Sequence, residues 1–278
     1  MKGQIFRIIA LVFALFITFG ITSCRIFPQE TSARAEALQA VSKKWDGKIK
    51  YKTTEGKLSA VVDNKADIVS PKFIPVKAGE RYILSGSFKS LGKTPSKVYY
   101  GFICYDKGKR QIDTFHSNVI LDSATTLAEA CKKGDKELMI KANNKWQKGN
   151  YAVAFNVKDN FSDLPNREVV YKIIKVVPRC ENMKVQLSKA LKKDYPAGTK
   201  VRMHTSAHGT YIYTAVCGAV IPKSWKAYEG SVTLGKPGQI GWQYLRPGTA
   251  FVKVIILPNY NKGNDERLAF KDLKLVIE

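Results

Sequence analysis

The sequence has few of the residues that most often carry catalysis. It holds three histidines, His116, His204 and His208. His204 and His208 are four residues apart, but Gly209 follows and nothing indicates a helix, so this spacing does not place both rings on one face. The motifs Gly-x-Ser-x-Gly and His-Glu-x-x-His and the Walker loop are absent. No carboxylate pair stands out as the acid and base of a glycosidase. These absences argue against the common hydrolases and nucleotide-binding enzymes.

Acidic residues are scarce. The chain has 23 Asp and Glu against 46 Lys and Arg, which gives a net charge of +23. Such an excess favours an anionic partner. Much of the positive charge is spread through turns instead of forming one run, so simple solubility is the alternative explanation.

Long apolar runs are absent after the first 24 residues. There, Lys2 and Arg7 supply a basic start, and the apolar run 8–17 follows. This run is shorter than the roughly 20 apolar residues that span a bilayer, and its layout is that of a secretory signal. We therefore expect residues 25–278 to lie outside the cytoplasm. An uncleaved membrane anchor is the alternative.

The segment closes on Ile21-Thr22-Ser23-Cys24, which resembles the lipobox of bacterial lipoproteins. The resemblance implies that residues 1–23 are a lipoprotein signal peptide and that lipid on Cys24 anchors the protein to a membrane of the cell envelope. Arg25 differs from the aspartate that retains some lipoproteins at the inner membrane, which favours the outer membrane where the organism has one. We expect no nucleic-acid partner at that location.

Four cysteines remain besides Cys24. They allow three pairings in an oxidising compartment. Cys104 and Cys217 lie in apolar, strand-like runs and are interpreted as buried thiols. The hypothesis is therefore a disulfide between Cys131 and Cys180. Because the sequence has no Cys-x-x-Cys spacing, a structural zinc site is not expected.

Alternation with a period of two dominates from Trp45 onward. Clear runs cover residues 81–88, 97–105, 210–217 and 250–257, and turns rich in Gly, Pro and Lys separate them. No amphipathic helix of ordinary length stands out. Many short strands without helices predict an all-β sandwich or barrel.

The middle of the chain has a pattern of its own. A Lys-Gly-Asp turn, a strand, a Trp-x-Lys-Gly turn and further strands follow one another there. This order resembles the small β-barrel inserts of phage and bacterial surface proteins. We predict an inserted β subdomain over residues 123–204, a parent domain formed by 41–122 plus 205–278, and a tether over 24–40.

Four stretches of the parent domain carry short family-like motifs. They are residues 70–82, residues 98–105, the step from Trp225 to Gly230, and residues 268–275. Together they resemble the galactose-binding-like jelly rolls, which include the carbohydrate-binding modules of secreted glycan-degrading enzymes. The resemblance implies a jelly-roll β-sandwich. Since each motif is short, it indicates a fold more than a function.

The same resemblance implies a structural calcium ion between the first and last strands. Asp272 stands where the family has a late aspartate. Calcium takes six to eight oxygen ligands, and many of them come from the backbone. A solvated carboxylate at a strand end is the alternative, and apart from calcium we expect no cofactor.

The resemblance also implies a sugar site made of aromatic faces and planar hydrogen-bonding side chains. Alternation places Tyr99 and Tyr105 on one face of their strand, and Tyr211 and Tyr213 share a face of another. Aromatic rings offer large, rigid contact area, and an arginine fork suits carboxylate or sulfate. Burial in the sandwich core is the alternative for each ring. The candidate sugar-binding residues are Tyr99, Tyr105, Tyr213, Trp242, Tyr244 and Arg246.

These observations lead to one hypothesis and two alternatives. The hypothesis is an exported, lipid-anchored, non-catalytic protein that binds carbohydrate, such as an acidic polysaccharide, or another anionic polymer of the envelope. The first alternative is a structural or adhesion protein without a sugar site. The second is a polysaccharide lyase or esterase.

Overall fold

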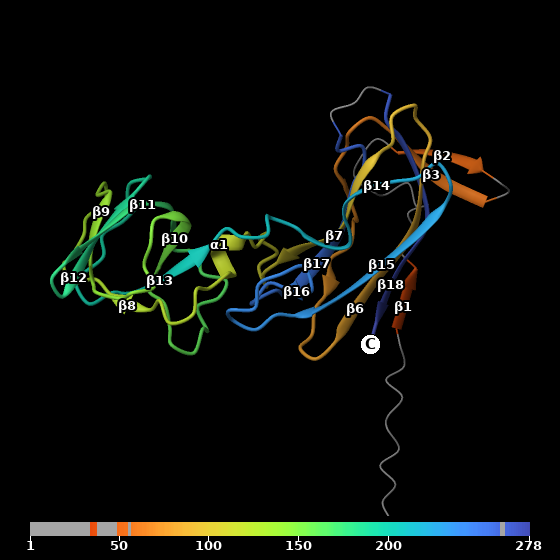
Figure 1. Ribbon diagram of the computed structural model, residues 1–278. Coiled ribbons are helices and arrows are strands. Elements are labelled where there is room, and N and C mark those ends of the chain that lie inside the picture. Colours follow the sequence, from red (N-terminus) through yellow and green to blue (C-terminus); the bar gives the residue numbers. More distant parts are fainter. Residues whose placement is uncertain (1–33, 38–48, 55–56, 262–264) are drawn as a thin grey trace, which may run out of the picture. The chain divides into compact units, whose positions relative to one another are not determined.

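Nearly all regular structure in the protein is β, as the computed structural model shows (Figure 1). The structure describes residues 34–37, 49–54, 57–261 and 265–278. The predicted signal peptide and the lipidation site Cys24 lie outside these residues. The strands form three sheets, and two of them enclose one core. The prediction of an all-β sandwich is therefore confirmed.

The largest sheet has seven strands. Their order is β16-β15-β6-β18-β3-β2, and β1 also pairs with β18. The strands are β1 (Arg34–Ala37), β2 (Lys50–Thr54), β3 (Lys57–Asp63), β6 (Arg81–Ser90), β15 (Lys226–Leu234), β16 (Tyr244–Leu245) and β18 (Arg267–Ile277). β1 lies inside the predicted tether, so these four residues extend the sheet instead. They fit because β3 pairs only with the first part of β18, which leaves Lys274–Ile277 available to β1.

The second sheet has five strands in the order β14-β7-β17-β4, with β5 also paired to β17. They are β4 (Ile68–Val69), β5 (Ile74–Pro75), β7 (Lys97–Tyr105), β14 (Ile212–Val220) and β17 (Phe251–Leu257). Alternate side chains of both sheets meet in one core. Tyr82 and Phe88 of β6, Phe102 of β7 and Val254 of β17 are fully buried there. Each large apolar side chain buried in this way contributes about 1.5–3 kcal/mol.

A third sheet uses only strands from the middle of the chain. The short helix α1 (Thr114–Ser117) precedes it. Its order is β8-β13-β10-β11-β12-β9, and it has a separate apolar core. The strands are β8 (Thr125–Thr126), β9 (Glu137–Lys141), β10 (Gly149–Phe155), β11 (Val169–Arg179), β12 (Asn182–Leu187) and β13 (Lys200–Thr205). A bridge between Leu127 and Ile140 brings the segment after β8 beside β9. The bounds of the inserted subdomain stay a prediction.

The structure corrects the predicted disulfide. Cys131 and Cys180 are both free thiols. Cys131 lies near the beginning of β9, since it lines a shallow depression together with Lys136 and Glu137. Cys180 lies in the turn between β11 and β12, beside the other end of β9. Disulfide-bonded cysteines need Cα atoms within about 7 Å, and the length of β9 alone exceeds this distance at about 3.3 Å per residue.

The described residues contain no helix that is both long and apolar enough to cross a membrane.

Gly101 allows the closest approach between two strands of the five-stranded sheet. It lies in β7, where the register with β14 shifts after Ile212. A Cβ atom on Gly101 would clash with the carbonyl group of Ile212. Because the obstacle is backbone, no side chain can move aside to make room.

We expect Gly101→Ala to lower the free energy of unfolding by about 3 kcal/mol or more, since overpacking against backbone must move a strand. Gly198→Ala is the control: its Cβ would meet open space, and only its φ of +81° opposes the change, at a cost of about 1–2 kcal/mol. Urea unfolding measures both variants. Equal losses would contradict this account of Gly101.

Candidate functional site

The outer face of the five-stranded sheet carries a second apolar layer, separate from the sandwich core. Ile103, Ile255 and Leu257 are buried in it, and partly exposed side chains pack around them. Most of these side chains are tyrosines. We call the following five residues the tyrosine face: Tyr99, Tyr105, Tyr211, Tyr213 and Tyr260.

Strand register explains how the sequence builds this face. Tyr105 pairs with Phe251, and Tyr99 pairs with Leu257. Because successive side chains of a strand point to opposite faces, the odd-numbered residues of β7 and β17 point outward. Their even-numbered neighbours, such as Phe102, point into the core. The shared face of Tyr99 and Tyr105 follows the alternation of the sequence.

The rings of the tyrosine face contact one another. The ring centroids of Tyr99 and Tyr213 are 4.8 Å apart, those of Tyr99 and Tyr260 5.8 Å, and those of Tyr211 and Tyr213 6.1 Å. Aromatic pairs favour separations of 4.5–7 Å. Burial, and then the nearby Tyr211, raises the pKa of Tyr105. The five rings therefore form one continuous surface that extends over three elements of the chain.

The hydroxyl groups of Tyr213 and Tyr260 stay protonated in neutral solution. Burial, followed by the nearby Tyr211 and Tyr99, raises the pKa of Tyr213 to about 12. Burial also raises the pKa of Tyr260, together with a hydrogen bond of 2.7 Å that its hydroxyl donates to the Asp67 carboxylate. Each ring thus presents an apolar surface and a neutral hydroxyl group, which both donates and accepts hydrogen bonds.

Lysines lie over the rings at both ends of the face. Nζ of Lys65 is 4.0 Å from the ring centroid of Tyr260, and Nζ of Lys97 is 5.8 Å from that of Tyr99. At the other end Phe73 packs edge-on against Tyr105, with centroids 4.9 Å apart. Two further ammonium groups lie over the Phe73 ring, those of Lys109 at 5.2 Å and Lys253 at 4.5 Å.

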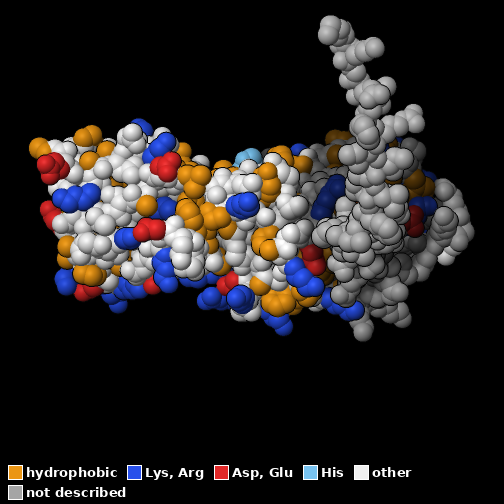
Figure 2. Space-filling model, turned by 90° about the horizontal axis from the view of Figure 1, so that it is seen from below, with side chains coloured by type: hydrophobic (Ala, Val, Ile, Leu, Met, Phe, Trp, Pro, Cys, Tyr) orange, Lys and Arg blue, Asp and Glu red, His pale blue; other side chains and the backbone are white. Residues whose placement is uncertain are grey.

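Positive charge is also spread over other parts of the described surface. On the side drawn in Figure 2, Lys and Arg side chains are scattered among polar and apolar ones and do not form one patch. Lysines also lie over the rings of Tyr195, Trp225 and Tyr228. The tyrosine face differs from these places because five tyrosines pack on one apolar layer there.

The structure brings together three of the predicted sugar-binding residues and separates the other three. Tyr99, Tyr105 and Tyr213 lie on the tyrosine face. Tyr244 instead lies in β16, paired with β15 in the seven-stranded sheet. Trp242 is 41% exposed and lies edge-on to His208, with ring centroids 5.5 Å apart.

Arg246 requires a correction. We predict its guanidinium as a surface fork for carboxylate or sulfate, but the residue is only 3% exposed. Its Nη2 donates a hydrogen bond to the carbonyl oxygen of Gly209, while Nε and Nη1 have no partner among the described residues. Burial lowers the pKa of Arg246. The Pro247-Gly248 turn that follows it lies close to Pro165.

Sequence reasoning missed Tyr260 and Phe73 as members or neighbours of the face. Both lie outside the long strands, in segments without alternation, so strand periodicity says nothing about them. The available sequence signal was weak in both cases. Lys72 precedes Phe73 in the sequence, and Lys65 lies over the Tyr260 ring in the structure, but basic turns of this kind recur along the chain.

Asp272, the predicted calcium ligand, lies at an irregularity of β18. The pairing with β6 shifts register between Lys271 and Lys274, and Asp272 has a φ of +53° there. With Ser85 and Glu229 it lines a shallow depression. The described residues contain no group of three or more His, Cys, Asp or Glu side chains that could hold a metal ion. Calcium at Asp272 stays a prediction.

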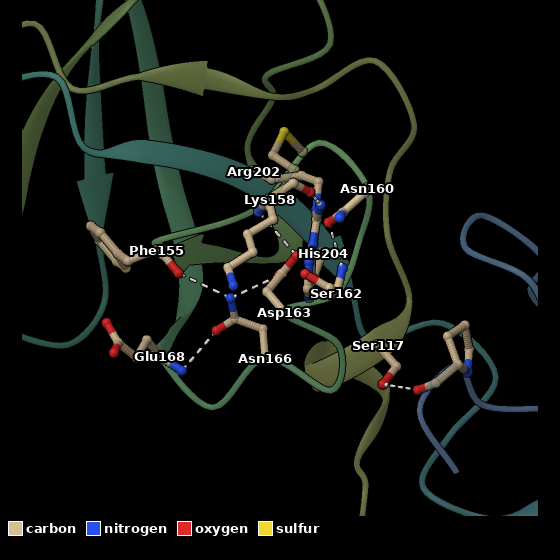
Figure 3. A network of polar contacts seen from close by, with 12 residues as sticks. Ser117, Phe155, Lys158, Asn160, Ser162, Asp163, Asn166, Glu168, Arg202 and His204 are labelled. Atoms are coloured by element: carbon tan, nitrogen blue, oxygen red, sulfur yellow. Dashed lines mark hydrogen bonds and ion pairs between the residues drawn. The ribbon is translucent and has the colours of Figure 1, made fainter.

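A polar cluster lies beside α1, and its members are joined by hydrogen bonds and ion pairs (Figure 3). Arg202 of β13 is buried, and its Nη2 lies 2.8 Å from Asp163 Oδ2. Arg202 Nε donates to Nε2 of His204, whose Nδ1 lies 2.7 Å from the Phe115 carbonyl oxygen. Asn166 donates to Asp163. Since these groups satisfy one another, we interpret the cluster as structural.

This cluster fixes the loop between β10 and β11, which reaches the sandwich. Arg167 of the loop donates from Nη2 to the Asp106 carboxylate at 2.6 Å. The backbone N–H of Asn166 donates to the carbonyl oxygen of His116. Burial raises the pKa of the Asp106 carboxyl, but hydrogen bonds from the Arg110 backbone and the Arg167 side chain together lower it by more. The pKa of Asp106 is therefore lowered. The loop is thus held by ion pairs at both of its sides.

Comparison with known proteins gives no relative. No model of a known protein family matches the sequence, and no curated protein matches it.

Loss of stability in acid should depend on His204. Burial, then the charge of Arg202, lowers the pKa of His204 to about 4, whereas an unfolded histidine has a pKa of about 6.5. Between these values only the unfolded chain takes up the proton, so stability falls as pH falls from about 6.5 to 4.

We expect the slope of unfolding free energy against pH to be shallower in His204→Gln by up to about 1.4 kcal/mol per pH unit. Urea unfolding from pH 7 to pH 4.5 measures this slope. His116, whose pKa is also lowered to about 4, is present in both proteins, so its contribution cancels. A parental slope in His204→Gln would refute the assignment.

Proposed function

We propose that this protein is a lipid-anchored protein of the bacterial cell envelope that binds glycan through the tyrosine face, without catalysis. One observation carries the proposal: five partly exposed tyrosine rings form a continuous surface on the outer face of a sandwich sheet. The rings of Tyr105, Tyr211 and Tyr213 form its middle.

The chemistry of the face suits sugar rings. A pyranose has C–H-rich faces, which pack on aromatic rings, and a rim of hydroxyl groups, which need hydrogen-bond partners. Tyrosine supplies both, because its ring is apolar and its hydroxyl donates and accepts. The exposed Asp67 carboxylate beside Tyr260 adds an acceptor. Sheet strands and packed loops hold the tyrosine rings and the Asp67 carboxylate, so little side-chain entropy is lost on binding.

The anchor is supported by the N-terminal pattern alone. Ile21-Thr22-Ser23-Cys24 resembles a lipobox, and two or more acyl chains give stable membrane attachment where a single chain does not. A protein held in this way stays within the envelope, where glycan polymers are abundant. Anchoring and glycan binding would then act together.

Glycan binding should depend on Tyr213. With the full chain, a panel of dextran, pullulan and polygalacturonate, and about 0.5 M salt to screen bulk charge, we expect saturable binding to at least one polymer. Tyr213→Ala should lower that affinity about tenfold, equivalent to about 1.4 kcal/mol, and Tyr213→Phe should keep most of it. Isothermal titration calorimetry measures the affinities.

Trp242→Ala is the matched control, because Trp242 is an exposed aromatic residue whose ring contacts His208 and is not among the tyrosines of the face. Its affinity should equal that of the parent protein. Equal affinities for Tyr213→Ala and the parent would refute the site. Absence of binding to all three polymers would favour the structural or adhesion alternative, and release of shortened or deacylated product would favour an enzyme.

Lipidation should depend on Cys24. Cells that express the parent protein with labelled palmitate should yield a labelled chain that begins at Cys24, and Cys24→Ser should carry no label. Cys217→Ser should keep the label; this thiol, which we predict to be buried, is exposed in the structure. An unlabelled parent protein would contradict the anchor.

A further inference from the structure

The lysines around the tyrosine face lack carboxylate partners. Lys65, Lys97, Lys109 and Lys253 make no ion pair with any Asp or Glu of the part of the chain that the structure describes. The chain contains such pairs elsewhere, as between Lys200 and Asp159. The four ammonium groups around the face are instead close to rings, whose faces attract cations.

These lysines divide the face into a middle and two ends. Lys109 and Lys253 cover the ring of Phe73 at one end, and Lys65 and Lys97 lie over the rings of Tyr260 and Tyr99 at the other. No lysine or arginine of the described residues lies over the three middle rings, which belong to Tyr105, Tyr211 and Tyr213.

The distance between the ends suits a polymer. Tyr99 and Tyr105 lie six residues apart on β7, which corresponds to about 20 Å along an extended strand. A single sugar is shorter than this span. A chain of sugars that packs on the middle rings would therefore reach the lysines at both ends.

The charge at these ends identifies the class of chain. A neutral glycan would leave four ammonium groups without a partner, whereas carboxylate or sulfate groups would pair with them. The lysine stem is flexible and its ammonium is a mobile point charge, so each lysine can leave its ring and follow an anionic group. Asp67 and Asp113, whose charges both act on Tyr211, do not offset this charge, because they are two carboxylates against four ammonium groups and Asp67 accepts the Tyr260 hydroxyl.

We infer that the glycan is an acidic polysaccharide: sugar rings pack on Tyr105, Tyr211 and Tyr213, and its carboxylate or sulfate groups pair with the lysines at the two ends. This inference rests on the proposed function and adds the ligand class to it. The shared chemistry is a repeating anionic group on a sugar chain, and uronate and sulfate are its two sources.

The test uses the full chain and two matched pairs of polymers in about 0.15 M salt. Polygalacturonate is compared with its methyl ester, and dextran sulfate with dextran, so that the two members of each pair share a sugar backbone and one of them lacks the anionic groups. The variant Lys97→Gln with Lys253→Gln removes one lysine at each end of the face. The control, Lys175→Gln with Lys189→Gln, removes the same charge from exposed lysines of the middle segment.

The parent protein should bind the acidic member of at least one pair at least tenfold more tightly than the neutral member. Lys97→Gln with Lys253→Gln should weaken that binding about fivefold to tenfold, as expected for the loss of two ion pairs at a partly exposed surface. Binding of the neutral polymers should not change. The control should bind as the parent does, and thermal unfolding should show that both variants are folded. The pair that shows the preference distinguishes uronate from sulfate.

Three results would overturn the inference, and they separate it from the proposed function. Equal affinity for acidic and neutral polymers, lost in Tyr213→Ala, would refute an acidic ligand and leave glycan binding in place. Equal weakening in both lysine variants would show attraction by bulk charge and refute the two-ended site. Absence of binding to all four polymers would refute the proposed function, and the inference would fail with it.

Discussion

The structure depends on one constraint: strand β7 is apolar on both of its faces. Its even-numbered residues, such as Phe102, fill the core between the two sheets, while Tyr99 and Tyr105 point the other way. A strand at the surface of a sandwich normally turns a polar side to water. β7 turns a tyrosine-rich side instead, and β17 beside it turns Ile255 and Leu257 to the same side. The sandwich core therefore determines the position of the candidate site, because one backbone carries both.

The loop between β10 and β11 illustrates a different principle. Burial of Arg202 and Asp163 costs desolvation, and the pair is kept because each polar atom finds a partner in the same cluster. A buried network of this kind is sensitive to geometry and resists alternative arrangements. It holds the loop so that Arg167 can reach Asp106 of the sandwich. In this way an ion pair between charged residues joins the loop to the sandwich.

Much of the fold could be predicted from the sequence, because strand alternation is a local property. The period of two was sufficient to identify an all-β sandwich and to place Tyr99 and Tyr105 on one face of their strand, but it left open whether that face points outward. It was not sufficient for Arg246, Cys131 and Cys180, whose surroundings depend on contacts between distant segments. Tyr260 joins the face from a loop, where no periodic signal exists. The sequence therefore predicts well which residues share a face of a strand, and it predicts poorly which residues surround a loop residue.

The lysines over the outer rings have a consequence for a crowded membrane surface. A broad aromatic surface on a protein anchored as proposed would tend to associate with the same surface of a neighbouring copy. Lys65, Lys97 and Lys253 lie against those rings, so two such surfaces brought together would confront like charges at short range. Natural sheets use charged side chains in this way to prevent self-association. The ammonium groups can therefore keep the protein dispersed while its aromatic face remains available.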